Sequence, residues 1–79
     1  MASIRLFAGA AEAAATDATT VNAATIGDLR TQLVQRYGTE FARVLGLCSL
    51  LVNGSRAADD EAPLADTDSV DVLPPFAGG

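Results

Sequence analysis

The segment TIGDLRTQLVQRYG, residues 25–38, is the clearest secondary-structure signal in the chain and decides the class of fold. Thr25 can cap a helix, and Asp28 follows three residues later, close to a capping-box pattern. Gly38 stands where a left-handed residue commonly ends a helix. Apolar residues recur at the helical period and form one face, namely Ile26, Leu29, Leu33 and Tyr37. The segment therefore predicts one amphipathic helix that must bury this face against a sheet.

Strand-like alternation lies on both sides of this helix. Residues 3–8 (SIRLFA) and 69–73 (SVDVL) alternate apolar and polar side chains, which predicts two half-buried strands. They are expected to be central neighbours that run parallel, because the helix crosses between them. Residues 19–25 (TTVNAAT) predict a second strand paired with the first as a hairpin. The segment between them, residues 9–18, is interpreted as a variable connection, although its alanines could form a turn of helix.

The remainder of the chain adds smaller elements. Residues 39–46 (TEFARVLG) predict a short second helix, and residues 48–57 (CSLLVNGSRA) predict a hairpin that turns at Asn53-Gly54. Residues 59–69 are expected to form an acidic loop that places Leu64 in the core. The order of elements predicts an α+β domain, a mixed sheet packed on one main helix. The larger candidates for the core are Ile4, Leu6, Phe7, Val21, Ile26, Leu29, Leu33, Phe41, Val44, Leu45, Leu50, Val52, Leu64, Val70 and Val72.

Size and charge restrict the possible functions. The chain has 79 residues, enough for one domain with a modest core, and a net charge of −5 with no lysine. This balance disfavours nucleic acid and anionic membranes as partners and favours a partner with a basic docking surface. No signal peptide or membrane-spanning run is recognisable, so the cytoplasm is the expected compartment.

The chain lacks histidine and lysine, two side chains that catalysis often uses. It contains no histidine, and Gly9, Gly27 and Gly38 do not have the spacing of a phosphate-binding loop. The lone Cys48 has no histidine to activate it and is expected to be a buried structural thiol. Residues 59–61 (DDE) are expected to be a solvated loop with at most weak affinity for a cation. We therefore expect a protein that is not catalytic alone and binds no metal or cofactor by itself.

The end of the chain is the remaining candidate for function. The residues that follow the last strand are Pro74, Pro75, Phe76, Ala77, Gly78 and Gly79. The two prolines favour a stiff, extended exit from the sheet. Gly78 and Gly79 have no Cβ, so the chain end can enter a narrow channel and present its carboxylate for activation. The alternative is an inert tail.

Four segments together resemble the small subunit of molybdopterin synthase, a MoaD-type member of the MoaD/ThiS family of ubiquitin-like sulfur carriers. They are LFAGAAE (6–12), TIGDLRTQLVQRYG (25–38), LLVNGSRA (50–57) and DTDSVDVLPPFAGG (66–79). Ala11 departs from the family pattern, in which many members carry arginine. The resemblance implies a β-grasp domain over residues 1–73 and an extended Gly-Gly tail over residues 74–79.

The resemblance also implies a mechanism and partners. Gly79 would be adenylated with ATP by a ubiquitin-activating-like adenylyltransferase (MoeB-type) and converted to a thiocarboxylate by a sulfur donor protein. The tail would then enter the large synthase subunit (MoaE-type), where the sulfur is transferred to precursor Z. Phe76 is expected to dock, together with Leu73 and Phe7 on the sheet, although Phe7 could equally belong to the core.

Three other functions fit the same sequence. The chain could carry sulfur for thiamine, thiolated tRNA or cysteine synthesis. It could be a protein modifier that forms isopeptide bonds through Gly79, but without lysine it could not form lysine-linked chains on itself. It could also be a binding module with an inert tail.

Overall fold

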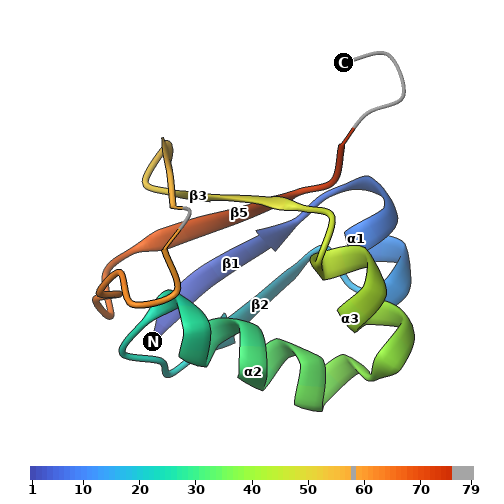
Figure 1. Ribbon diagram of the computed structural model, residues 1–79, viewed down its shortest axis with the longest axis horizontal. Helices are drawn as coiled ribbons and strands as arrows, with labels where there is room; N and C mark the ends of the chain where they lie inside the picture. The colour runs from blue at the N-terminus through green and yellow to red at the C-terminus, as the bar shows by residue number, and fades with distance from the viewer. Residues whose placement is uncertain (58, 76–79) are drawn as a thin grey trace.

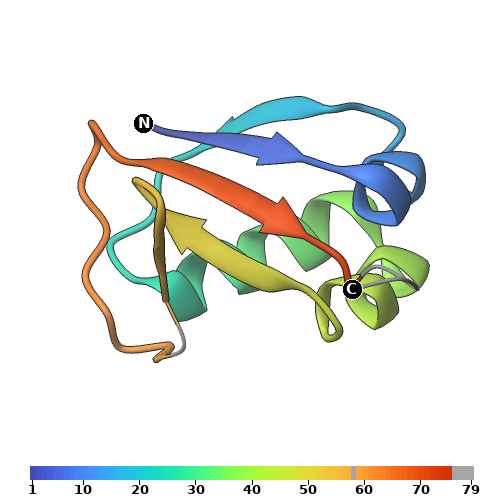
Figure 2. The same ribbon diagram turned by 90° about the horizontal axis from the view of Figure 1, so that it is seen from above.

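The computed structural model places all helices on one face of a single sheet (Figure 1). It describes residues 1–57 and 59–75. The strands are β1 (Ala2–Leu6), β2 (Ala18–Val21), β3 (Ser49–Val52), β4 (Ser55–Arg56) and β5 (Ser69–Leu73). The helices are α1 (Ala8–Ala14), α2 (Ile26–Tyr37) and α3 (Thr39–Leu45). Within these described ranges no helix lies on the other face of the sheet, which Figure 2 views from above, and we call it the open face.

The sheet has the predicted centre. Its strand order is β2-β1-β5-β3-β4, and β1 and β5 pair in parallel, with Arg5 opposite Asp71. β2 pairs antiparallel with β1, and β3 pairs antiparallel with β5. This is the β-grasp arrangement of a mixed sheet closed over one main helix, as the sequence predicted.

The main helix begins and ends near the predicted residues. The Asp28 amide donates to the Thr25 hydroxyl oxygen at 3.1 Å, which satisfies one of the free amides of the first turn. Gly38 ends α2 as predicted, with a positive φ of 94° that favours glycine, but its ψ of −169° lies outside the left-handed helical region. Gly38 is also the N-cap of α3, so its backbone conformation turns the chain from α2 directly into the next helix.

The first connection differs from the prediction. Residues 9–18 were expected to be a variable link, but α1 occupies Ala8–Ala14, and both Ala10 and Ala14 are buried. Alanine gives no amphipathic contrast to read in a sequence, so only packing reveals which side of this segment is inside. β2 ends at Val21 and not at the predicted residue 25, and Asn22–Thr25 lead into α2.

The core fills the layer between the sheet and the helices. Phe41 is fully buried, and its ring centroid lies 5.2 Å from that of Tyr37. Val44 and Val52 are half-buried at the margin of the core, although both were predicted inside it. Phe7 is also half-buried and does not belong to the core. Leu64 is buried as predicted.

Two turns position the second half of the sheet. Asn53 and Gly54 connect β3 to β4, with φ of 51° and 87°, the positive values that this tight hairpin requires. The acidic loop packs on the start of α2, where the carbonyl of Asp60 accepts from the Gly27 amide at 2.8 Å. The N-terminal amides of α2 therefore bond to this loop and to its own cap.

Side chains of α2 occupy the outer edge of β2. Arg36 donates to the Thr20 carbonyl at 2.9 Å, and Gln32 donates to the Asn22 carbonyl at 2.7 Å. These bonds occupy acceptors that an added strand would need. The outer edge of β2 is therefore less open to an added strand at these positions. Among the described helices, none has the length and apolar character to cross a membrane.

Candidate functional site

The candidate site is the place where the chain leaves the sheet. β5 ends at Leu73, followed by the half-buried Pro74 and the exposed Pro75. Because β1 and β5 are parallel, this end of the sheet lies opposite the N-terminus (Figure 1). The predicted site residues Phe76, Ala77, Gly78 and Gly79 lie outside the described residues.

Apolar side chains surround this exit. The Phe7 amide donates to the Val72 carbonyl at 3.2 Å, which keeps Phe7 level with Leu73 at the end of the two central strands. Leu73 also pairs with Ser49 at the start of β3. Leu47 is 62% exposed and lies just before β3 at the same end of the sheet. We call Phe7, Leu47, Leu73, Pro74 and Pro75 the tail-end patch.

The structure thus brings together four of the site residues predicted from the sequence, Phe7, Leu73, Pro74 and Pro75. Leu47 was missed. Its signal was its place directly after Gly46, which ends α3, because a large apolar residue in a short connection has few neighbours to cover it. Ala11, where the family pattern has arginine, is half-buried on α1 and offers no side chain for a polar contact.

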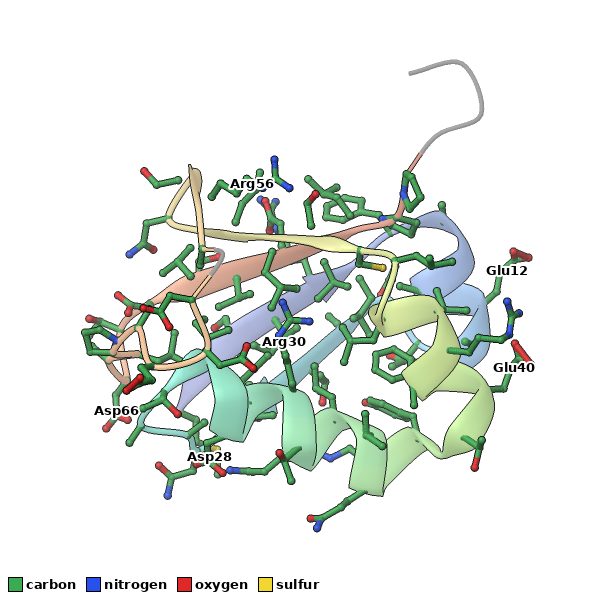
Figure 3. The ribbon with its side chains drawn as sticks, in the orientation of Figure 1. Glu12, Asp28, Arg30, Glu40, Arg56 and Asp66 are labelled. Atoms are coloured by element: carbon green, nitrogen blue, oxygen red, sulfur yellow. The ribbon has the colours of Figure 1, made fainter. Side chains whose placement is uncertain are left out.

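A row of four side chains crosses the open face beside the tail-end patch. Arg5 of β1 is opposite Asp71 of β5, Asp71 is opposite Leu51 of β3, and Leu51 is opposite Arg56 of β4. The alternation of strands places these residues on the face away from the core, since their neighbours Ile4, Val70 and Leu50 are buried. Figure 3 shows Arg56 on this side of the sheet, away from α2.

Arg5 is fixed within this row. Its Nε and Nη2 atoms donate to the two oxygens of Asp71 at 2.8 and 2.9 Å. These hydrogen bonds and the charge of Asp71 raise the pKa of Arg5. The guanidinium carbon also lies 5.7 Å from the centre of the Phe7 ring. Arg5 therefore holds Phe7 against the open face at the border of the tail-end patch.

Cys48 is not an activated nucleophile. It is half-buried, less than predicted, and its Sγ donates to the Val44 carbonyl at 3.1 Å. Burial raises the pKa of the Cys48 thiol, and the opposing effect of the Arg30 charge is smaller. Since the thiolate is the reactive form, this environment keeps the thiol unreactive near neutral pH.

The acidic loop has a structural role in the geometry observed. Asp60 forms an ion pair with Arg30 of α2 at 3.1 Å, and Asp59 accepts from the Glu61 amide at 2.9 Å. Within the ranges that the structure describes, no three His, Cys, Asp or Glu side chains are arranged to hold a metal ion, and no pocket is present.

The chain is similar to several proteins of known structure. The small archaeal modifier protein SAMP1 from Haloferax volcanii is 31% identical, over 99% of this chain and 98% of that one, with a TM-score of 0.84. A subunit of the molybdopterin-converting factor complex from Helicobacter pylori is 24% identical over 99% and 97%, with a TM-score of 0.76. A chain of the Amycolatopsis orientalis BexX/CysO complex is 18% identical over the full length of both, with a TM-score of 0.84. No curated protein matches the chain significantly.

The sheet, its crossover helix and the exit of β5 define the small ubiquitin-like β-grasp fold that these structures share. The model of the ThiS family matches residues 4–79, nearly the whole chain. The protein therefore belongs to the ThiS family.

Proposed function

We propose that this protein carries sulfur as a thiocarboxylate on Gly79 and delivers it to precursor Z during molybdenum cofactor synthesis. One observation carries the proposal: a Pro-Pro-x-x-Gly-Gly end follows the central strand of a β-grasp sheet, directly beside the partly exposed tail-end patch. The strand anchors the tail, and the patch gives a partner a surface to hold while it takes up the chain end.

The chemistry resides in the C-terminal carboxylate and in the partners. An adenylyltransferase with ATP converts the Gly79 carboxylate to an acyl adenylate and releases pyrophosphate. The outer sulfur of a persulfide on a donor protein then attacks the acyl carbon, and AMP leaves, so that an acyl disulfide joins the two proteins. A thiol then attacks the donor's sulfur atom and forms a disulfide with it, which breaks the S–S bond and releases the thiocarboxylate. Gly78 and Gly79 serve this chemistry by lacking Cβ atoms that would obstruct the nucleotide and the attacking group.

The partners proposed here are an adenylyltransferase of the MoeB type, a sulfur donor protein and a large synthase subunit of the MoaE type. The tail, residues 74–79, enters each active site in turn; Phe76 contacts the entrance, while Phe7, Leu47 and Leu73 on the body of the domain rest on the rim. The protein itself supplies no catalytic side chain and uses ATP only through the activating partner. It acts in the cytoplasm, where these partners are expected.

Intact mass spectrometry tests the carrier role. Protein from cells that co-express the activating enzyme and sulfur donor should gain about 16 Da, the replacement of one oxygen by sulfur. Deletion of Gly79 should abolish the gain, whereas Leu47→Ser should still accept sulfur at saturating enzyme. An unchanged mass, with an enzyme shown to be active on another carrier, contradicts the proposal.

A synthase assay tests the pathway. Thiocarboxylated protein mixed with the cognate large subunit and precursor Z should yield molybdopterin. If the mass gain is present but no molybdopterin forms, the sulfur belongs to another product, such as thiamine, a thiolated tRNA or cysteine.

The second candidate is a protein modifier, favoured by the 31% identity to the Haloferax volcanii modifier over nearly the whole chain. In this role the activated Gly79 forms amide bonds with lysines of other proteins. Higher-mass adducts of a tagged protein should appear in cells and disappear when Gly78 and Gly79 are deleted. If no adducts appear under conditions that produce the thiocarboxylate, the modifier role is contradicted and only the carrier role remains.

A further inference from the structure

The charges of the sheet differ from those of the rest of the molecule. Only three residues of the five strands are charged, Arg5, Arg56 and Asp71, and all three lie in the row across the open face. The strands thus have one net positive charge in a chain whose net charge is −5. In Figure 3, Glu12, Glu40, Asp28 and Asp66 all lie toward the helices or the ends of the sheet, away from Arg56.

The five arginines differ in the hydrogen bonds and ion pairs that they form within the described residues. Arg5 bonds to Asp71, Arg30 to Asp60, and Arg43 to Glu40. Arg36 donates to Thr19 and Thr20 at the edge of β2. Arg56 is exposed and has no hydrogen bond or ion pair with any residue in the described ranges 1–57 and 59–75.

The open face changes in character toward the tail. Ser3 and Ser69 are paired at the end far from the tail. The charged row follows, and Phe7 and Leu73 complete the face next to the exit of the chain. An enzyme that holds the tail must therefore cover the apolar end first and the charged row next, with Arg56 at the rim on the outermost strand.

We propose that Arg56 pairs with a carboxylate on the enzyme that activates Gly79, and that this pair orients the carrier on its open face. The inference rests on the proposed function, because it assigns a contact to the partner that takes up the tail. An acidic and apolar partner surface is repelled by the excess of carboxylates on the rest of this molecule and attracted by Arg56, which has no carboxylate partner in the described ranges. The contact thus gives orientation that a uniformly basic partner surface could not give.

The expectation from net charge alone was a basic docking surface on the partner. The distribution of charge reverses that expectation at the open face, where the cations outnumber the carboxylate. A rim charge of this kind acts mainly on the rate of association and its salt dependence, while the apolar end and the tail determine how long the complex lasts.

Adenylation by the ubiquitin-activating-like adenylyltransferase of the same organism tests the inference. Pyrophosphate exchange is measured against carrier concentration for the wild type, Arg56→Glu and the matched control Arg43→Glu, which reverses another exposed arginine, on α3. Thermal unfolding confirms that each variant is folded. Arg56→Glu should raise the KM for the carrier about tenfold, with kcat at saturation within about twofold of the wild type. Arg43→Glu should stay near the wild type.

Salt provides a second readout. The KM of the wild type should rise with NaCl, and Arg56→Gln should flatten this dependence, because the neutral side chain has no charge to screen. Equal KM values for Arg56→Glu and Arg43→Glu would overturn the inference and leave the proposed function intact. A wild type that supports no exchange, with an enzyme active on another carrier, would overturn both. Self-association of the wild type that Arg56→Glu abolishes, with an unchanged KM, would assign the face to a second copy instead.

Discussion

Asn53 and Asp68, fifteen residues apart, join the β3–β4 turn to the start of β5. The side-chain Nδ2 of Asn53 donates to Asp68 Oδ1 at 2.9 Å. The side-chain Oδ1 of Asn53 accepts from the Ser69 backbone amide, also at 2.9 Å. Asp68 Oδ2 accepts from the Ala65 amide at 2.8 Å. One carboxylate thus fixes both the hairpin and the turn that begins the strand leading to the tail.

This arrangement predicts a loss of stability in acid. The bond from the Ala65 amide, followed by that from Asn53, lowers the pKa of Asp68. A carboxylate with a lowered pKa stabilises the folded state above its unfolded pKa, about 4, and this contribution is lost as pH falls through the folded value. Asp68→Asn should therefore lower Tm at neutral pH and converge with the wild type near pH 2.

Thermal unfolding from about pH 7 to pH 2 measures this effect. Glu12→Gln, an exposed carboxylate on α1, is the control and should follow the wild type throughout. A constant difference in Tm between Asp68→Asn and the wild type across the whole range would show that Asp68 acts without its charge.

Cys48 should react slowly with thiol reagents in the folded protein. Burial raises the pKa of its thiol, so the thiolate fraction at neutral pH is smaller than in an unfolded chain. The rate of alkylation plotted against pH should have its midpoint above that of the protein in denaturant. A midpoint at or below the denatured value would mean that the Arg30 charge outweighs burial.

The N-terminal cap of α2 should contribute measurably to stability. Thr25→Ala removes the oxygen that accepts from the Asp28 amide and should lower the free energy of unfolding by about 1 kcal/mol. Thr25→Ser keeps an acceptor and should lose much less. Urea unfolding of both variants tests this, and equal losses for alanine and serine would assign the effect to the methyl group of threonine.

Stability should rise with salt. The net charge of −5 comes from ten carboxylates against five arginines, and their mutual repulsion is strongest at low ionic strength. Tm should therefore increase between about 0.05 M and about 1 M NaCl, where the Debye length falls to about 3 Å. The variant Glu61→Gln/Asp66→Asn, which removes two exposed carboxylates, should show a smaller increase. An equal increase would point to salt effects on apolar burial instead.

The sequence predicted the elements whose signals are local. The cap at Thr25, the turn at Asn53-Gly54 and the alternation in β1 and β5 each depend on residues within one turn or strand. The same applies to the six-residue tail, because its two prolines and two glycines restrict or free the backbone by themselves. These features were sufficient to predict a mixed sheet on one main helix, with the first and last strands parallel at its centre, and to direct attention to the end of the chain.

The tertiary structure alone decided what depends on packing and register. The alanines of α1 carry no contrast between inside and outside, so their burial at Ala10 and Ala14 follows only from the neighbouring layers. The row from Arg5 to Arg56 draws one residue from each of four strands, and a slip of one residue in any pairing would send its member into the core. The chemistry proposed for the tail depends on the sequence of its last residues, but the open face beside it exists only once the strands are in register.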